Sequence, residues 1–243
     1  MLPLPRIRSL SEGNVDQVLE QAGGRRAHAD ADRRDLRNSD NLLGRAIIEL
    51  KLLEDERLEK PEARAKIAEL FGSIDTNRPV VVIDTGSLMP AQRQEYDTII
   101  RATIKAAVRS ARAQLKQTRS EVDPGATNVL LIINNGFTAM RHEDLVEHAV
   151  GRARNDTNQI DAVVFAGCYL HGDGFDTYAL WPIDCVAINE ERPFREFEDL
   201  RRSWGALADK HMTEFVRGEH GEFAGKEAQT DVAFDWEGRT YVK

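Results

Sequence analysis

The spacing of apolar and polar residues divides this chain into alternating strands and helices. Residues 45–52 alternate strictly, so that one face is wholly apolar while Glu49 and Lys51 share the opposite face. Continuous apolar runs predict buried strands at 79–84, 128–133 and 160–166. Apolar residues three and four apart predict helices at 11–22, 61–71, 90–119, 142–154 and 196–216.

The order of these elements predicts an α/β fold with a mixed central β-sheet flanked by helices. We expect a fourth strand at 178–188, placed at an edge by Pro182, and a closing hairpin at 231–242. Residues 167–177 are rich in glycine and acidic residues and predict a loop. A chain of 243 residues fits one large domain better than two, so we predict a single α/β domain over 1–243.

A β-hairpin around Gly44 and Arg45 brings chemistry-bearing side chains together. If the chain reverses there, Asp40 lies opposite Glu49, because cross-strand partners are symmetric about a turn. Lys51 lies two residues further along the same face as Glu49. Two carboxylates and an ammonium at this spacing can hold a divalent metal and direct a water, which is an arrangement for cleaving phosphodiesters.

Asp40 followed by Glu49-Leu50-Lys51 on a buried strand resembles the motif of the PD-(D/E)XK nuclease superfamily. The resemblance implies a restriction-endonuclease-like core over residues 12–135, with 136–243 as an extension of the same sheet and an acidic C-terminal part. Two departures are visible. Ser39 stands where the family motif has proline, and the helix after Lys51 lacks the glutamine that many members carry.

The resemblance also implies a cofactor and roles for the motif residues. Mg²⁺ or Mn²⁺ is expected on Asp40 and Glu49, with the backbone carbonyl of Leu50 as a third ligand. Lys51 is expected to orient the attacking water or to stabilise the transition state. The predicted reaction is metal-dependent hydrolysis of a phosphodiester, foremost in DNA. Many nucleases of this kind dimerise to cut both strands, so a homodimer is compatible with the resemblance.

In that superfamily the helix before the hairpin often adds another carboxylate. Glu20, Asp16 and Glu12 are the candidates on the helix at 11–22. Glu20 ranks first because its turn of the helix is nearest the following glycines, although each of the three also fits a solvated position.

The helix predicted at 90–119 carries a stripe of basic residues about 80° wide. Its members are Arg101, Lys105, Arg109, Arg112, Lys116 and Arg119. Such a row is suited to following the phosphates of a nucleic acid. A solvated face, or a surface that pairs with the acidic C-terminal half, explains the same pattern.

Charge is distributed unevenly. The formal net charge is −8, yet residues 1–120 carry 21 Lys and Arg against 18 Asp and Glu, whereas 121–243 carry 12 against 23. The basic half holds the candidate site, so nucleic acid is an acceptable partner on that side only. No apolar run has membrane-spanning length, and no secretory signal is recognisable. With only Cys168 and Cys185, expected to be buried thiols, we predict a cytoplasmic protein without a membrane partner.

Three other interpretations compete with the nuclease. Glu49 and Lys51 fit the solvent face of a half-exposed strand with no function. A catalytically inactive binding or assembly protein with a nuclease-like fold fits the net charge and the departures from the motif. A small-molecule hydrolase that uses the loops after Asp84 and Asn134 is the third, and it requires a pocket at those strand ends.

Overall fold

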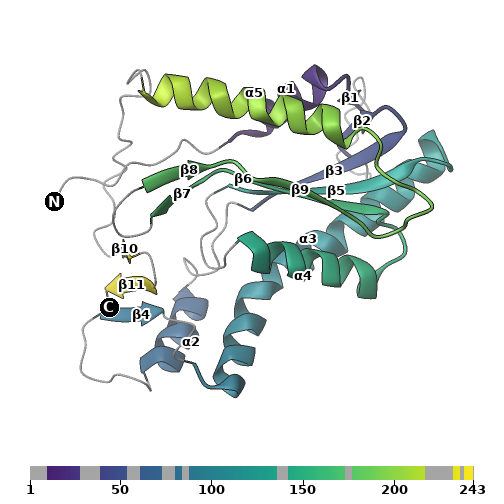
Figure 1. The fold of residues 1–243 in the computed structure, drawn as a ribbon. Coiled ribbons are helices and arrows are strands. Elements are labelled where there is room, and N and C mark those ends of the chain that lie inside the picture. The colour runs from purple at the N-terminus through teal and green to yellow at the C-terminus, as the bar shows by residue number, and fades with distance from the viewer. Residues whose placement is uncertain are drawn as a thin grey trace.

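The computed structural model describes residues 10–27, 39–53, 61–72, 80–83, 88–135, 142–172, 177–216, 232–235 and 238–242. Its main feature is a six-stranded mixed sheet in the order β1-β2-β3-β5-β6-β9 (Figure 1). Strands β3, β5 and β6 are parallel, while β2 and β9 run antiparallel to their neighbours β3 and β6. The predicted α/β fold with a mixed sheet flanked by helices is therefore confirmed.

The helices are α1 (Glu12–Gln21), α2 (Pro61–Gly72), α3 (Pro90–Val122), α4 (His142–Asp156) and α5 (Phe197–Val216). The strands of the main sheet are β1 (Arg25–Arg26), β2 (Asn41–Leu43), β3 (Ala46–Leu53), β5 (Thr127–Asn134), β6 (Ala162–Gly167) and β9 (Ile183–Ala187). Strands β4 (Val80–Ile83), β10 (Val232–Asp235) and β11 (Gly238–Val242) form a second sheet, and β7 (Tyr169–Gly172) pairs with β8 (Thr177–Leu180).

Helices cover both faces of the main sheet. Helices α1 and α5 lie on one face, and α3 and α4 on the other, with α2 beyond them (Figure 1). The alternation of β3 follows this layering, because Ile48 and Leu50 pack with α1 and α5 while Ile47 and Leu53 pack with the core of α2, α3 and α4. Since each face of β3 has its own helical layer, side chains on both faces are removed from water.

Most elements predicted from the sequence are present in the structure, and three predictions that concern strands differ from it. Strand β4 pairs with β11, outside the main sheet. The expected strand at 178–188 is divided into β8 and β9 around Pro182, and β9 is the edge strand. The expected loop at 167–177 contains β7. The hairpin at the C-terminus is confirmed by the pairing of β10 with β11. Within the described residues, no helix has the length and apolar character needed to cross a membrane.

Candidate active site on the β2–β3 hairpin

The predicted hairpin is confirmed, with Gly44 and Arg45 as its two turn residues. Leu43 pairs with Ala46, and Asn41 pairs with Ile48. A type II′ turn has a positive φ at its first central residue and not at its second. Gly44, the first, has a φ of 55°, and no non-glycine residue of the described chain, Arg45 included, has a positive φ. Continuing this register by one residue places Asp40 opposite Glu49, which is the arrangement expected from the sequence.

The Asp40 carboxylate is fixed against the next strand. Its Oδ2 atom accepts a hydrogen bond from the Leu50 backbone N–H at 2.8 Å. Burial raises the pKa of Asp40, and the nearby negative charge of Glu12 raises it further, whereas the Leu50 N–H and Lys51 oppose the shift. Asp40 is therefore oriented by the backbone and held in a site that disfavours its charge.

Glu49 is the most deeply buried acid of the site, with 0% of its surface exposed. Its Oε1 atom lies 2.5 Å from Lys51 Nζ, and Lys51 itself keeps 22% of its side chain exposed. Burial, and then the charge of Asp40, raise the pKa of Glu49 to about 8 even though Lys51 opposes the shift. The interpretation of this face as solvent-exposed is wrong for Glu49, which is fully buried, whereas Lys51 is partly exposed and contacts Gln114 of helix α3.

Helix α3 supports the site through a row of uncharged polar residues that the sequence reading overlooked. Gln114 Oε1 accepts hydrogen bonds from Lys51 Nζ at 3.2 Å and from Ser110 Oγ at 2.9 Å. One turn further on, Thr118 Oγ1 accepts a hydrogen bond from the Ser39 N–H at 2.8 Å. In the sequence, this row could have been recognised from the four-residue spacing of Ser110, Gln114 and Thr118 along the edge of the apolar stripe of the helix.

The donor set suits a small, hard divalent cation. Asp40 Oδ2 and Glu49 Oε1 are hydrogen-bonded within the protein. Glu49 Oε2 is buried and makes no well-aligned hydrogen bond to a described residue, although the Ser39 side chain is close enough to lower the pKa of Glu49. The Leu50 carbonyl lies on the Asp40 side of β3, because the N–H and C=O of one strand residue point the same way. Mg²⁺ needs only one or two carboxylates and keeps several waters. No group of three His, Cys, Asp or Glu side chains suited to a metal occurs in the described ranges, so a bound ion would rely on these two carboxylates.

The helix before the hairpin brings Glu12, rather than Glu20, toward the site. Glu12 stands at the first turn of α1 and is close enough to influence the pKa of Asp40. Glu20 is exposed and lies eight residues along the helix, about 12 Å of axial rise away. Asp16 is engaged by an ion pair with Arg26 and by a hydrogen bond from Asn41. The ranking of Glu20 first rested on its nearness to the glycines, and of the three acids only Glu12 is among the charges that shift the pKa of Asp40.

The basic stripe of α3 lies on the flank toward α4. Arg101 bonds to Asp97 and His148, Arg112 bonds to the Asp156 carbonyl, and Arg119 is paired with Asp161. The other three members are exposed and make no hydrogen bond or ion pair with another described residue: Lys105, Arg109 and Lys116. Gln114 follows Lys105 by nine residues, about half a revolution around the helix, so the stripe and the Lys51 site occupy opposite flanks.

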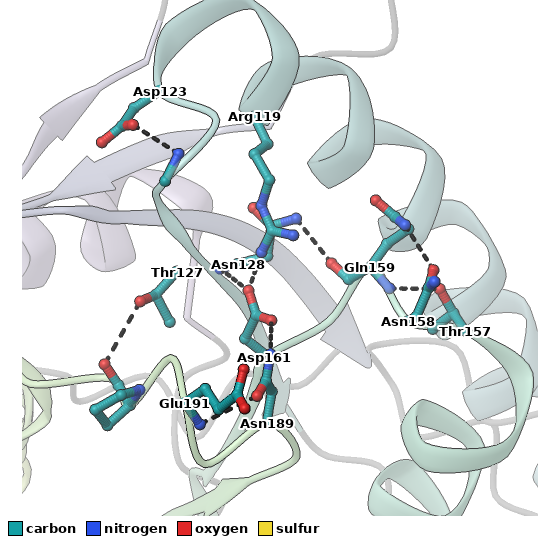
Figure 2. A network of polar contacts seen from close by, with 12 residues as sticks. Arg119, Asp123, Thr127, Asn128, Thr157, Asn158, Gln159, Asp161, Asn189 and Glu191 are labelled. Atoms are coloured by element: carbon teal, nitrogen blue, oxygen red, sulfur yellow. Dashed lines mark hydrogen bonds and ion pairs between the residues drawn. The ribbon is translucent and has the colours of Figure 1, made fainter.

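A second buried polar cluster, around Asp161, lies where β5 and β6 begin (Figure 2). Asp161 Oδ2 accepts from Arg119 and from the Asn128 N–H, and Oδ1 accepts from the Asn189 amide at 3.1 Å. Burial lowers the pKa of Arg119 to about 10, and neighbouring Arg192 acts in the same direction. Because Asp161 joins α3, β5 and the segment after β9, we assign this cluster to holding the sheet and helices together.

Searches of family models, of curated proteins and of solved structures found no match for this chain. The likeness to the PD-(D/E)XK nucleases therefore rests on Asp40, Glu49 and Lys51 and on the geometry that joins them.

Proposed function

We propose that this protein is a Mg²⁺- or Mn²⁺-dependent nuclease that hydrolyses phosphodiesters, foremost in DNA. The observation that carries the proposal is the buried Glu49 carboxylate. It stands beside Asp40 and bonds Lys51 through one oxygen, while its other oxygen makes no well-aligned hydrogen bond to a described residue, although the Ser39 side chain is close enough to lower the pKa of Glu49. Buried acids with raised pKa values and specific charged neighbours are concentrated at functional sites.

The order of elements around the site supports a restriction-endonuclease-like core. Asp40 follows β1 and directly precedes β2, the Glu-x-Lys triplet lies on β3, and α2 comes next in the chain. After the helical crossover, β5 pairs parallel to β3, while β6 and β9 continue the same sheet. This arrangement agrees with the proposed division into a core over 12–135 and an extension over 136–243, within one domain.

The residues of the site have separable roles in the proposed reaction. Asp40, Glu49 and the Leu50 carbonyl would hold the metal, which lowers the pKa of a bound water and neutralises charge on the phosphate. The Leu50 N–H keeps Asp40 in orientation. Lys51 is the partly exposed cation of the site, so its ammonium is placed to stabilise charge that develops on the phosphate oxygens.

Cleavage of supercoiled plasmid and of a single-stranded circle tests the proposal. We expect nicking with Mn²⁺ and none with EDTA, and we expect Lys51→Ala to slow nicking by about 10²–10³-fold, as loss of a transition-state contact does. Lys210→Ala, an exposed lysine on α5, is the matched control and should nick at the wild-type rate. Wild-type activity in Lys51→Ala would remove Lys51 from the mechanism.

We further propose that Lys105, Arg109 and Lys116 contact phosphates outside the cleavage site, since they lie on the other flank of α3. The triple alanine variant should lower the slope of log affinity against log salt by about 3 for duplex DNA, about one unit for each lost contact. An unchanged slope would show that these three residues do not contact phosphates and form a solvated surface. A homodimer and a cytoplasmic location remain predictions, and sedimentation of the protein with and without DNA tests the first.

A catalytically inactive binding or assembly protein is the second candidate. The observation that favours it is the ion pair of Glu49 with Lys51, which satisfies part of the site without a metal. This candidate predicts no thermal stabilisation by Mn²⁺. A melting temperature that rises with Mn²⁺ in the wild type and stays constant in Asp40→Ala would count strongly against it.

A further inference from the structure

Lys51 has two acceptors for its ammonium, and they come from different parts of the fold. Glu49 Oε1, from the same strand, lies 2.5 Å from Nζ, and Gln114 Oε1, from α3, lies 3.2 Å away. The first acceptor is an acid that becomes negatively charged when it loses its proton, and the second is an amide that is always neutral. The ammonium is therefore already in contact with a group that can hold it when Glu49 is engaged elsewhere.

Glu49 is the group for which Lys51 and a metal would compete. Its carboxylate is fully buried, and one oxygen is bonded to Lys51. A divalent cation on the other oxygen would place two cations, with three positive charges in all, on a single carboxylate in a site with little water, where charges interact strongly. Binding of the metal therefore weakens the contact between Lys51 and Glu49.

The amide of Gln114 is set up to receive the ammonium. Ser110 Oγ donates to Gln114 Oε1 at 2.9 Å, and this bond is consistent with the amide oxygen, rather than its NH₂ group, facing Lys51. Thr118, one turn along α3, anchors the Ser39 N–H next to Asp40. One rigid helix thus sets the position of both the second acceptor of Lys51 and the segment that carries Asp40.

We propose that Gln114 is a positioning residue that takes over Lys51 when a divalent metal binds Glu49. This inference rests on the proposed metal site. Gln114 then keeps the ammonium beside the metal without adding a negative charge. Metal affinity should depend on Gln114, and the dependence should require Lys51.

Calorimetric titration with Mn²⁺ tests this on four proteins: wild type, Gln114→Leu, Lys51→Met and the double variant. Gln114→Leu should weaken Mn²⁺ binding about tenfold, the effect of losing a hydrogen bond to a charged group. Lys51→Met should bind Mn²⁺ more tightly than the wild type, because the competitor for Glu49 is gone. In that background Gln114→Leu should have no further effect.

Gln114→Glu is the conservative variant, with nearly the same shape and an acceptor for Lys51. It should bind Mn²⁺ at least as tightly as the wild type. Equal Mn²⁺ affinity of Gln114→Leu and wild type would overturn the inference, as would an equal loss with and without Lys51. Absence of Mn²⁺ binding by the wild type would instead refute the proposed metal site, and the role of Gln114 with it.

Discussion

Replacement of Glu49 by glutamine should change how the stability of the metal-free protein depends on pH. Burial raises the pKa of Glu49 from an ordinary value of 4.5 to about 8 in the folded chain. Between these two values the folded state binds more protons than the unfolded state, so stability falls as the pH rises. Below pH 4.5, where Glu49 is protonated in both states, the folded protein has its full stability. This stability is lost progressively as the pH rises toward 8, the pKa of Glu49 in the folded chain.

The magnitude follows from the shift and the burial. Each pH unit in this range lowers the free energy of unfolding by about 1.4 kcal/mol, hence by about 3 kcal/mol between pH 5 and 7.5. No solvent reaches Glu49 to screen its charge, since 0% of its surface is exposed. Glu49→Gln should match the wild type near pH 5, where Glu49 is also neutral, and should exceed it in stability near pH 8.

Urea unfolding in EDTA from pH 5 to 8 measures this difference. Asp40 also has a raised pKa and its charge interacts with that of Glu49, so the comparison measures Glu49 together with this coupling. Glu69→Gln, at an exposed position of α2, is the control with the same chemical change and should follow the wild-type curve. Parallel curves for wild type and Glu49→Gln across the range would mean that Glu49 is ionised throughout, and the argument from burial would fail.

Three further predictions concern the rest of the fold. Asp161→Asn should lower the free energy of unfolding by about 3–5 kcal/mol in urea titrations, because it leaves a buried guanidinium without its counter-charge. Gly44→Ala should lower the free energy of unfolding by about 1–2 kcal/mol, because Gly44 has a positive φ. Gly151→Ala should raise it by up to about 1 kcal/mol, because Gly151 lies inside α4 with open space where a Cβ would stand. Thermal melts of the two variants measure both effects. Burial raises the pKa of Cys168 to about 12, so its alkylation by iodoacetamide at pH 8 should be slow until the protein unfolds.

The hairpin of the candidate site was predictable because its determinants are local. Alternation over 45–52 sets the faces of β3, and Gly44 supplies the positive φ that a two-residue turn needs. Once the turn is placed, the pairing of Asp40 with Glu49 follows by symmetry. Long apolar runs similarly located β5 and β6, since a strand buried on both faces has no alternation to obscure it.

The burial of Glu49 was not predictable from those residues. A strand with charged residues on alternate positions has the pattern of a half-exposed strand, and only the packing of α3, some 60 residues later, covers the charged face. Gln114 was missed for the same reason. Its partner Lys51 is 63 residues away in the sequence, and periodicity within a helix does not identify contacts at that distance.

The structural role of Asp161 was also not predictable from the sequence. It stands alone before an apolar strand, and its partners come from α3, from β5 and from the segment after β9. The sequence assigned Arg119 to a basic stripe by its spacing alone. Spacing identifies the side of a helix, but which neighbour occupies that side is decided by tertiary packing.

Glu49 occupies a position in which an acid is expected to add little to the stability of the fold. A buried ion pair often adds less stability than a packed apolar pair would. Glu49 Oε2 makes no well-aligned hydrogen bond to a described residue, and the Ser39 side chain offsets only part of the rise in the pKa of Glu49. Asp161, by contrast, is an acid of similar burial whose two carboxylate oxygens are both bonded. Although both of these oxygens are bonded, the partners Arg119 and Asn128 each keep a buried polar atom without a hydrogen bond among the described residues. In the proposed metal site a bound ion would supply a partner for the Glu49 carboxylate, so the metal-free protein would be expected to keep Glu49 incompletely bonded.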